Sequence, residues 1–495
     1  MSARASFLAS GVETFESRNP ATGALIGTYP IFTAAQVHET VRRARSAAGW
    51  WAELGFAARG KVLRAWRSTL MRRSKELVDL VHAENGKPEA DAMVEVILSA
   101  QHLDWASKHA REVLGPRRVP SGMMMFNHSA TVEYQPLGVI GVLGPWNYPV
   151  FGPIGSIGYA LAAGNAVVFK PSEYTPQIGH WLADTFRELV GDRPLFQTVT
   201  GPGSTGAALC RSGVDKIGFT GSPATGRKVL AACAEDLTPA AIECGGSDAL
   251  LVDEDADLDA AADAAVWGGM SNAGQTCIGI ERVYVHERVY DAFVAKVVRL
   301  AGSLAAGEGE PIGPITMPSQ VTIIRRHIAD ALERGGRALI GGLHAVGERY
   351  VQPTVLVDVP EESAAVREET FGPTLTVARV KDMDEALQKA NGTKFGLGGA
   401  VFSRRRGLEL ARRMRSGMTS VNAALTFAGV PSLPYGGVGE SGFGRIHGPE
   451  GLREWARPKA ITQQRFSSPL RATTFRRRSS DERWLAHLAR LLYGR

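Results

Sequence analysis

The feature that most constrains the fold of this chain is a series of short apolar runs that begins at Gly138 and is separated by Gly and Pro. The runs are GVIGVLGP, AVVFKPS, FQTVTG and KIGFTG, and an Ala-rich or amphipathic stretch of helical length follows each of them. Apolar runs of this length are typical of strands that are buried on both faces of a sheet. Their regular alternation with helices predicts a parallel, doubly wound sheet.

A second series of the same kind lies further along the chain. Its expected strands are ERVYVHERV, RALIGG, PTVLVDV and LTVARV, and the helical patterns around them cover 258–273, 288–306, 317–335 and 383–390. Upstream, residues 34–114 have helical periodicity with break signals at Gly60 and Gly86–Pro88, and residues 131–135 alternate as a strand does. We therefore predict two α/β domains in tandem, with a boundary near 243–248.

The charge of the chain is concentrated in its C-terminal part. The formal net charge is +6, and residues 462–495 carry eight Arg, one Asp and one Glu, which is 8 − 2 = +6. The remaining part is neutral, so we expect no nucleic-acid partner. Four Cys without metal-type spacing predict neither a disulfide framework nor a metal site, and favour a reducing cytoplasm. The 36 uncharged residues of 134–169 contain Pro and Gly that would break a membrane helix, which predicts a buried strand–loop–helix–strand instead.

Two residues have the chemistry of a nucleophile and its base. Cys277 follows Asn, Gly, Gln and Thr in NAGQTC, a turn-forming setting that suits a nucleophile on a loop, although a lone Cys is more often a small buried side chain. Glu243 follows an apolar run and precedes two glycines. In an apolar cleft its pKa would rise and it would become a usable general base, whereas on a surface it would be a simple turn residue.

Polar residues also follow the expected strands of the first series. Asn147 in GPWNYP could donate to an oxyanion, or could form a turn beside two prolines. Lys170 and Glu173 in FKPSE could hold the hydroxyls of a ribose, or form a solvated pair of charges. The two Gly-rich turns at 201–206 and 219–226 could bind a pyrophosphate, although a helix cap explains either one without a ligand.

Nine motifs in one order carry a resemblance to the aldehyde dehydrogenase superfamily. They are GPWNYP, FKPSE, FTGSPATG, ECGG, NAGQTC, EETFGP, KFGLGGAVFS, VN and PYGGVGESGFGR, and the resemblance runs from about residue 15 to residue 461. It implies an α/β fold of two parallel-sheet domains, one of them a Rossmann-like cofactor domain, with a small β oligomerisation element. The implied ranges are 1–117 with 136–245 for the NAD-binding domain, 246–432 for the catalytic domain, 118–135 with 433–463 for the oligomerisation element, and 464–495 for a basic tail.

The resemblance also implies the reaction. Cys277 would attack an aldehyde, Asn147 and the backbone N–H of Cys277 would hold the oxyanion, and Glu243 would activate water to hydrolyse the resulting thioester. We predict NAD rather than NADP, because Glu173 would accept from a ribose 2′-hydroxyl and repel a 2′-phosphate. The implied cofactor-binding residues are Trp146, Lys170, Ser172, Glu173, Gly203, Phe219, Ser222, Glu369 and Phe371.

Two positions depart from the family pattern, and the substrate residues are less specific. Ser247 stands where the family usually has Lys, and Ile446 stands where it often has an acidic residue. A mixture of aromatic and small residues without an Arg favours apolar aldehydes over dicarboxylic semialdehydes. The alternatives are a CoA-acylating enzyme, which Glu243 disfavours, and a membrane-associated member that acts on lipid-derived aldehydes. A non-catalytic scaffold would lack the catalytic set. The expected pocket residues are Tyr148, Phe151, Thr426 and Phe427.

The tail predicts a short amphipathic helix. Ser479 and Glu482 form a capping-box pattern, and an apolar face follows at helical spacing. A helix this short needs a surface to pack against. That surface is the rest of this chain, a neighbouring subunit of a homodimer or homotetramer, or an anionic membrane, which would make the enzyme peripheral to the membrane's inner face. The residues of the apolar face are Trp484, Leu485, Leu488, Leu491 and Leu492.

Overall fold

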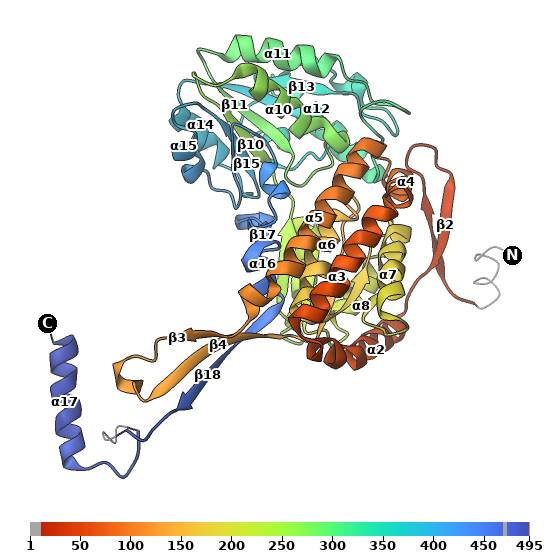
Figure 1. The fold of residues 1–495 in the computed structure, drawn as a ribbon. Helices are drawn as coiled ribbons and strands as arrows, with labels where there is room; N and C mark the ends of the chain where they lie inside the picture. Colours follow the sequence, from red (N-terminus) through yellow and green to blue (C-terminus); the bar gives the residue numbers. More distant parts are fainter. Residues whose placement is uncertain (1–10, 469–472, 495) are drawn as a thin grey trace. The chain divides into compact units, whose positions relative to one another are not determined.

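The computed structural model describes residues 11–468 and 473–494, which form two compact units (Figure 1). The first unit comprises the described residues up to Val113 together with Pro136–Ala456. The second comprises Leu114–Gln135 and the described residues from Arg457 onward. Both predicted α/β domains therefore lie within the first unit.

The first sheet of this unit has six strands in the order β17-β9-β8-β5-β6-β7. Five of the strands are parallel, as the alternating pattern predicts, and the uncharged stretch after Glu133 forms β5, helix α6 and β6. The sixth, β17, comes from near the end of the chain and pairs antiparallel with β9. The strands are β5 (Val139–Leu143), β6 (Ala166–Lys170), β7 (Phe196–Thr198), β8 (Lys216–Gly221), β9 (Ala240–Cys244) and β17 (Gly442–Phe443).

The helical N-terminal region forms four helices. Gly60 does not break a helix as expected, because it lies inside α3 at a close approach, where a Cβ would be 2.7 Å from the carbonyl oxygen of Ser107. The break at Gly86 is confirmed, since Gly86 ends α4 with a left-handed conformation. The helices of this half are α2 (Ala34–Glu53), α3 (Gly55–Arg72), α4 (Ser74–Asn85), α5 (Glu89–Leu114), α6 (Phe151–Ala163), α7 (Pro176–Val190), α8 (Gly203–Cys210) and α9 (Pro223–Ala234); a hairpin of β1 (Thr14–Arg18) and β2 (Leu25–Pro30) precedes them.

The second sheet has seven strands in the order β12-β13-β14-β11-β10-β15-β16. All pairs are parallel except that of the edge strand β12 with β13, and the four predicted strands are present. The strands are β10 (Asp248–Val252), β11 (Ile280–His286), β12 (Arg337–Ile340), β13 (Thr354–Val357), β14 (Thr374–Val380), β15 (Gly399–Phe402) and β16 (Ser420–Val421). The helices are α10 (Leu258–Met270), α11 (Tyr290–Gly302), α12 (Pro318–Glu333), α13 (Ala364–Arg367), α14 (Met383–Ala390) and α15 (Gly407–Arg413), while α16 (Gly448–Glu454) packs against α6 of the first half.

The second unit contains a three-stranded sheet and the C-terminal helix. The sheet has the order β18-β4-β3, with β3 (Arg117–Val119), β4 (His128–Pro136) and β18 (Ala456–Gln464). The predicted tail helix is present as α17 (Ser479–Tyr493), and none of its residues is buried. Its N-terminal cap lies one residue earlier than expected, because the Arg478 N–H donates to Asp481 at 2.8 Å. Among the described residues, no helix is both long and apolar enough to cross a membrane.

Candidate active site

A cavity of about 340 Å³ in the first unit brings the three predicted catalytic residues together. Glu243 reaches it from the end of β9, Asn147 from the loop after β5, and Cys277 from the loop between α10 and β11. Loops that follow parallel strands meet at one edge of a sheet, which is where α/β proteins commonly place ligands. The remaining walls come from α5, from the start of α6, from α10, from residues 424–426 and 428–429, and from the segment that leads to β17 and α16.

The loop that carries Cys277 is held in an unusual backbone conformation. Asn272 and Ala273 have φ values of 51° and 56°, and a Cβ at Gly274 would lie 2.0 Å from the carbonyl oxygen of Gly372. The Asn272 side chain donates to the backbone oxygens of Asn147 and Gln275, both at 3.1 Å. Asn272 therefore joins the two loops that carry the nucleophile and the amide, a role that the sequence analysis did not assign to it.

Asn147 is buried, and its amide points toward the Cys277 loop. Its Nδ2 donates to the backbone oxygen of Gln275 at 3.0 Å. An Asn side-chain amide has two N–H groups, so one donor is left for a ligand atom in the cavity. This arrangement is compatible with the role of an oxyanion donor.

The sulfur of Cys277 has a hydroxyl partner that the sequence analysis missed. Tyr435 Oη lies 3.2 Å from Cys277 Sγ, and Tyr435 is buried. Burial, followed by the charge of Glu243, raises the pKa of the Cys277 thiol well above its usual value, and the hydrogen bond from Tyr435 lowers it in part. Tyr435 belongs to the motif PYGGVGESGFGR, so its position was visible in the sequence, but its direction toward Cys277 was not.

Glu243 has the environment of a carboxyl group that can act as a base. It is 8% exposed, and burial raises its pKa to about 8, against smaller opposing contributions from hydrogen bonds to Cys277 and Thr220. Its buried Oε1 has no hydrogen-bond partner among the described residues. A carboxylate with one unused oxygen facing a cavity can accept a proton from water or from a thiol.

Three further carboxyl groups lie beside this site, of which Asp248 and Glu281 are buried and Glu369 is half-buried. Burial raises the pKa of Asp248 and of Glu281 to about 7 in each case, and that of Glu369 well above its ordinary value. Glu281 accepts from the backbone N–H groups of Thr370 and Phe371 at 2.9–3.0 Å. The charge of a nearby cation therefore affects how readily these carboxyl groups ionise.

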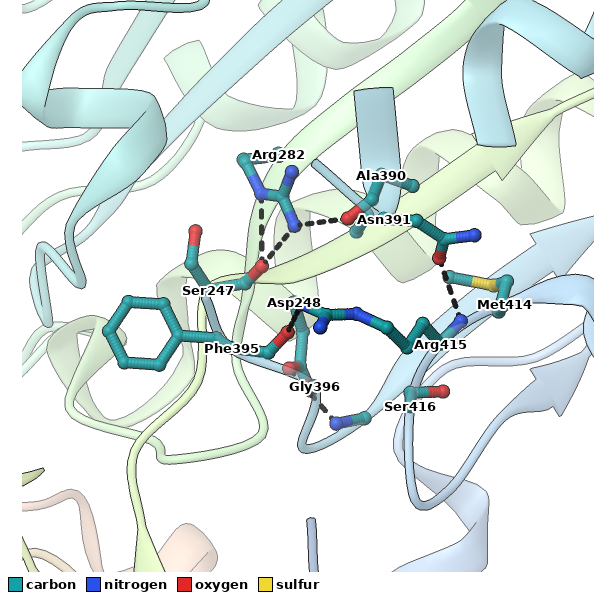
Figure 2. A pocket seen from close by; sticks show the side chains of 12 residues that line it. Ser247, Asp248, Arg282, Ala390, Asn391, Phe395, Gly396, Met414, Arg415 and Ser416 are labelled. Atoms are coloured by element: carbon teal, nitrogen blue, oxygen red, sulfur yellow. Dashed lines mark hydrogen bonds between the residues drawn. The ribbon is translucent and has the colours of Figure 1, made fainter. Parts of the chain in front are cut away.

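Ser247 occupies the position of the usual family Lys, and an arginine is the cation beside it (Figure 2). The Arg282 guanidinium donates from Nε and Nη2 to the backbone oxygen of Ser247 at 2.9 and 2.6 Å. Its charge lowers the pKa of Asp248 and of Glu281 in part. The small pocket drawn in Figure 2 holds about 10 Å³, which is room for about one water molecule, so it is not a second ligand site.

Three of the residues that are predicted to bind the nicotinamide half of the cofactor lie close together. Trp146 and Phe371 form an edge-to-face pair with ring centroids 5.6 Å apart. Glu369 Oε1 accepts from the Gly246 N–H at 3.0 Å, which leaves its other oxygen for a ribose hydroxyl. Since carboxylate oxygens are acceptors only, this free oxygen suits a ligand whose hydroxyl group donates to it.

The predicted adenosine-side residues lie at the ends of β6 and β8. Lys170 Nζ and Glu173 Oε2 are 3.1 Å apart, and the Glu173 side chain is 42% exposed. Ser172 is buried, and its Oγ accepts from the backbone of Tyr174. Ser222 caps α9 by accepting from the Thr225 N–H.

Two further predicted cofactor residues have contrasting surroundings. Gly203 is the first residue of α8, where a Cβ would meet nothing within 4 Å, so a ligand has room to approach the start of this helix. Phe219 on β8 is buried, and its ring lies beside Gly221 and Gly226. The open approach to the starts of α8 and α9 fits the phosphates of a dinucleotide.

Of the four predicted substrate residues, three line the cavity and one does not. Tyr148, Phe151 and Thr426 are lining residues, and Tyr148 Oη lies 3.0 Å from Thr276 Oγ1. Phe427 is not, because its ring is buried beside Gly398. Ile446, the other departure from the family pattern, lines the cavity with an apolar side chain in place of an acid.

Comparison with known proteins agrees with this site. The model of the aldehyde dehydrogenase family matches residues 7–461. The chain belongs to the aldehyde dehydrogenase family. A Mycobacterium ulcerans relative, named as a candidate NADP(+)-dependent succinate-semialdehyde dehydrogenase, is 36% identical over 90% of this chain and 87% of its own length. A 4,4′-diapolycopene aldehyde oxidase of Methylomonas is 35% identical over 92% and 87% respectively. The solved structure of an Escherichia coli NADP-dependent enzyme has a TM-score of 0.87 at 32% identity and covers 91% of this chain and 95% of that one.

The names of these relatives contradict the predicted preference for NAD over NADP, so that prediction is wrong. Both the mycobacterial protein and the E. coli structure are named for NADP. The structure supplies a physical reason, since the Glu173 carboxylate faces the Lys170 ammonium and its side chain is 42% exposed. A carboxylate whose charge is offset by an ammonium and screened by water does not exclude a 2′-phosphate.

Proposed function

We propose that this aldehyde dehydrogenase oxidises apolar aldehydes to carboxylic acids through a covalent intermediate on Cys277. One observation carries the proposal: Cys277, Glu243 and Asn147 face a single apolar cavity, and Glu243 has a buried oxygen without a partner there. A nucleophile, a base and a neutral donor around one cavity are what acyl chemistry on a thiol requires.

The first steps use the Cys277 thiol and two hydrogen-bond donors to the oxygen of the aldehyde. The Cys277 thiol releases its proton to water, and the thiolate attacks the aldehyde carbon to give a thiohemiacetal. The Asn147 amide and the backbone N–H of Cys277 donate to the oxygen as it becomes negative. Removal of one such donor typically lowers the rate by about 10²–10³.

The later steps release the acid. A nicotinamide, when bound near Trp146, Glu369 and Phe371, supplies the acceptor for the hydride, which leaves a thioester on Cys277. Glu243, whose pKa of about 8 is that of a competent base near neutral pH, then takes a proton from water as the water attacks the thioester. Because the free carboxyl oxygen favours hydrolysis, transfer of the acyl group to CoA is the disfavoured alternative.

The charges around the cavity argue for an apolar substrate. Among the described residues that line it, none is Lys, Arg or His, and the ionisable groups other than Cys277 and two tyrosines are the acids Asp91, Glu95 and Glu243. Lys87 lies nearby, but its ammonium is completely buried, 2.5 Å from Glu95 and 3.9 Å from the centre of the Tyr148 ring. A carboxylate at the far end of the substrate would therefore meet acidic side chains and no free cation.

The relatives are named for both kinds of substrate, so the substrate class needs a direct test. We expect benzaldehyde and medium-chain alkanals to have a higher kcat/KM than succinic semialdehyde with whichever cofactor, NAD or NADP, supports activity. A higher kcat/KM for succinic semialdehyde would overturn the proposed substrate class. Stimulation of turnover by added CoA would overturn hydrolysis as the final step.

For the tail we propose that α17 packs against a neighbouring subunit of a homo-oligomer. None of its residues is buried within this chain, and Trp484 and Leu491 are 61% and 64% exposed. An apolar helix face of this kind is marginal in water without a partner.

A further inference from the structure

The side chains that line the cavity of Cys277 differ in their exposure to solvent. Its inner residues Glu243 and Tyr435 are 8% and 5% exposed, whereas two other lining residues, Val94 of α5 and Trp267 of α10, are 50% and 52% exposed. Exposed side chains that also line a cavity mark its opening. The opening is therefore bordered by an aliphatic side chain, an indole and the exposed side chain of Thr426.

Apolar surface continues outward from this opening. Ile97 lies three residues after Val94 on α5, which puts both on the same face of the helix, and it is 47% exposed. Val430, 40% exposed, directly follows the lining residue Gly429. We call Val94, Ile97, Trp267 and Val430 the apolar rim.

Exposed apolar residues that adjoin a functional cavity usually mark a binding surface. The cavity volume of about 340 Å³ is near the lower end of the range of about 300–1,000 Å³ for small-molecule sites. A long substrate whose aldehyde carbon reaches Cys277 must therefore extend past the opening. The first surface that its far end meets is the apolar rim.

We propose that the substrates are aldehydes with long, unbranched apolar tails, and that the end of the tail lies on the apolar rim. This inference rests on the proposed oxidation of apolar aldehydes and adds the length of the substrate and a second binding region. The rim is specific for shape and hydrophobicity rather than for charge, because each of its four residues is uncharged.

A chain-length series measures the contribution of the rim. Each methylene group that is fully buried contributes about fourfold to kcat/KM. A methylene that lies on the rim is covered on one side only, so we expect about twofold for each one beyond the capacity of the cavity. For butanal to tetradecanal, kcat/KM is then expected to rise steeply at first and continue to rise more gently, instead of reaching a plateau.

Two further comparisons separate the rim from general hydrophobicity. The ω-hydroxyl derivative of dodecanal would place a polar group on the rim, so it should have a lower kcat/KM than dodecanal. The Trp267→Ser variant should lower the ratio of kcat/KM for dodecanal to that for butanal by about fivefold or more, because an exposed indole contributes a large apolar contact. The Leu408→Ser variant is the matched control, since Leu408 is 64% exposed on α15 and does not line the cavity.

We compare the ratio of kcat/KM for dodecanal to that for butanal, because a variant of which only part is folded has both values lowered by the same factor. A plateau in the wild-type series at medium length, or an unchanged ratio in Trp267→Ser, overturns the role of the rim. A plateau would also be the result if a second copy of the chain covered the rim. Absence of turnover with every aldehyde would instead contradict the proposed function itself, so the two failures are distinguishable.

Discussion

Replacing Glu243 with Gln removes the proposed base while it preserves the size of the side chain. Glu243 is buried and has a pKa of about 8, so about one tenth of it is ionised at pH 7 and about nine tenths at pH 9. If hydrolysis of the thioester limits turnover, wild-type kcat should rise about tenfold over this interval. The Gln variant should lose about 10²–10⁴ in steady-state kcat, which corresponds to about 3–5 kcal/mol.

Rapid mixing with absorbance detection of the reduced nicotinamide distinguishes the two halves of the reaction. The Gln variant should retain a burst that approaches one reduced cofactor per Cys277, because the thioester forms and then accumulates. Its remaining slow turnover should lack the rise between pH 7 and pH 9.

The control for this experiment is the same substitution at another buried carboxyl. Glu84 is also buried, with a pKa raised to about 7, but it accepts from the backbone of Gln177 and Ile178 and does not line the cavity. Glu84→Gln should keep the pH-dependent rise in kcat. Loss of the burst in Glu243→Gln, or a wild-type kcat that is constant from pH 7 to pH 9, would refute the assignment of Glu243 as the hydrolytic base.

The remaining predictions concern other parts of the molecule. Asn147→Ala should lower kcat/KM by about 10²–10³ without a matching loss of thermal stability; an equal fall in melting temperature and rate would count against an oxyanion role. Tyr435→Phe removes the 3.2 Å contact with the sulfur, so alkylation of Cys277 by iodoacetamide should shift to higher pH, and an unchanged profile would show that the contact is only structural. Burial lowers the pKa of His102 to about 4, so the unfolded chain binds the extra proton between about pH 6.5 and pH 4. The free energy of unfolding in urea should therefore fall as the pH is lowered through this interval, by up to about 3 kcal/mol from this group, and a smaller fall in His102→Leu would confirm the source. A chain that ends at Gln463 should form oligomers with fewer subunits, as measured by light scattering, than the full chain; an unchanged number of subunits combined with lost sedimentation on anionic vesicles would favour the membrane instead.

The sequence was most informative where one physical pattern determines the structure. The apolar runs after Gly138 and the second series from 281 onward form the two sheets, because strands buried on both faces must be apolar throughout. Gly60 was misread as a helix break, since a Gly inside a helix can also serve a close contact, here with Ser107. Only the three-dimensional packing distinguishes these two uses.

The site was predictable in its members and less so in its interactions. Cys277, Glu243 and Asn147 were identified by motifs, and they do face one cavity. The contact of Tyr435 with the sulfur, and the choice between a ribose site and a charge pair for Lys170 and Glu173, depend on side-chain directions that motif spacing does not specify. The cofactor prediction was wrong for the same reason, because it treated the charge of Glu173 as if it stood alone.

The return of the chain to the first sheet affects the order in which the enzyme can form during synthesis. β17 pairs Gly442 with Glu243, and Tyr435 and Ile446 from the same returning segment line the cavity. The strand that carries the base therefore lacks its outer neighbour until nearly the whole chain has left the ribosome. Because domains generally begin to fold from the N-terminus as they are made, the two sheets can assemble earlier than the wall that encloses the thiol. A nascent chain arrested before residue 442 is then expected to hold most of its fold while its Cys277 is still open to oxidants and alkylating reagents.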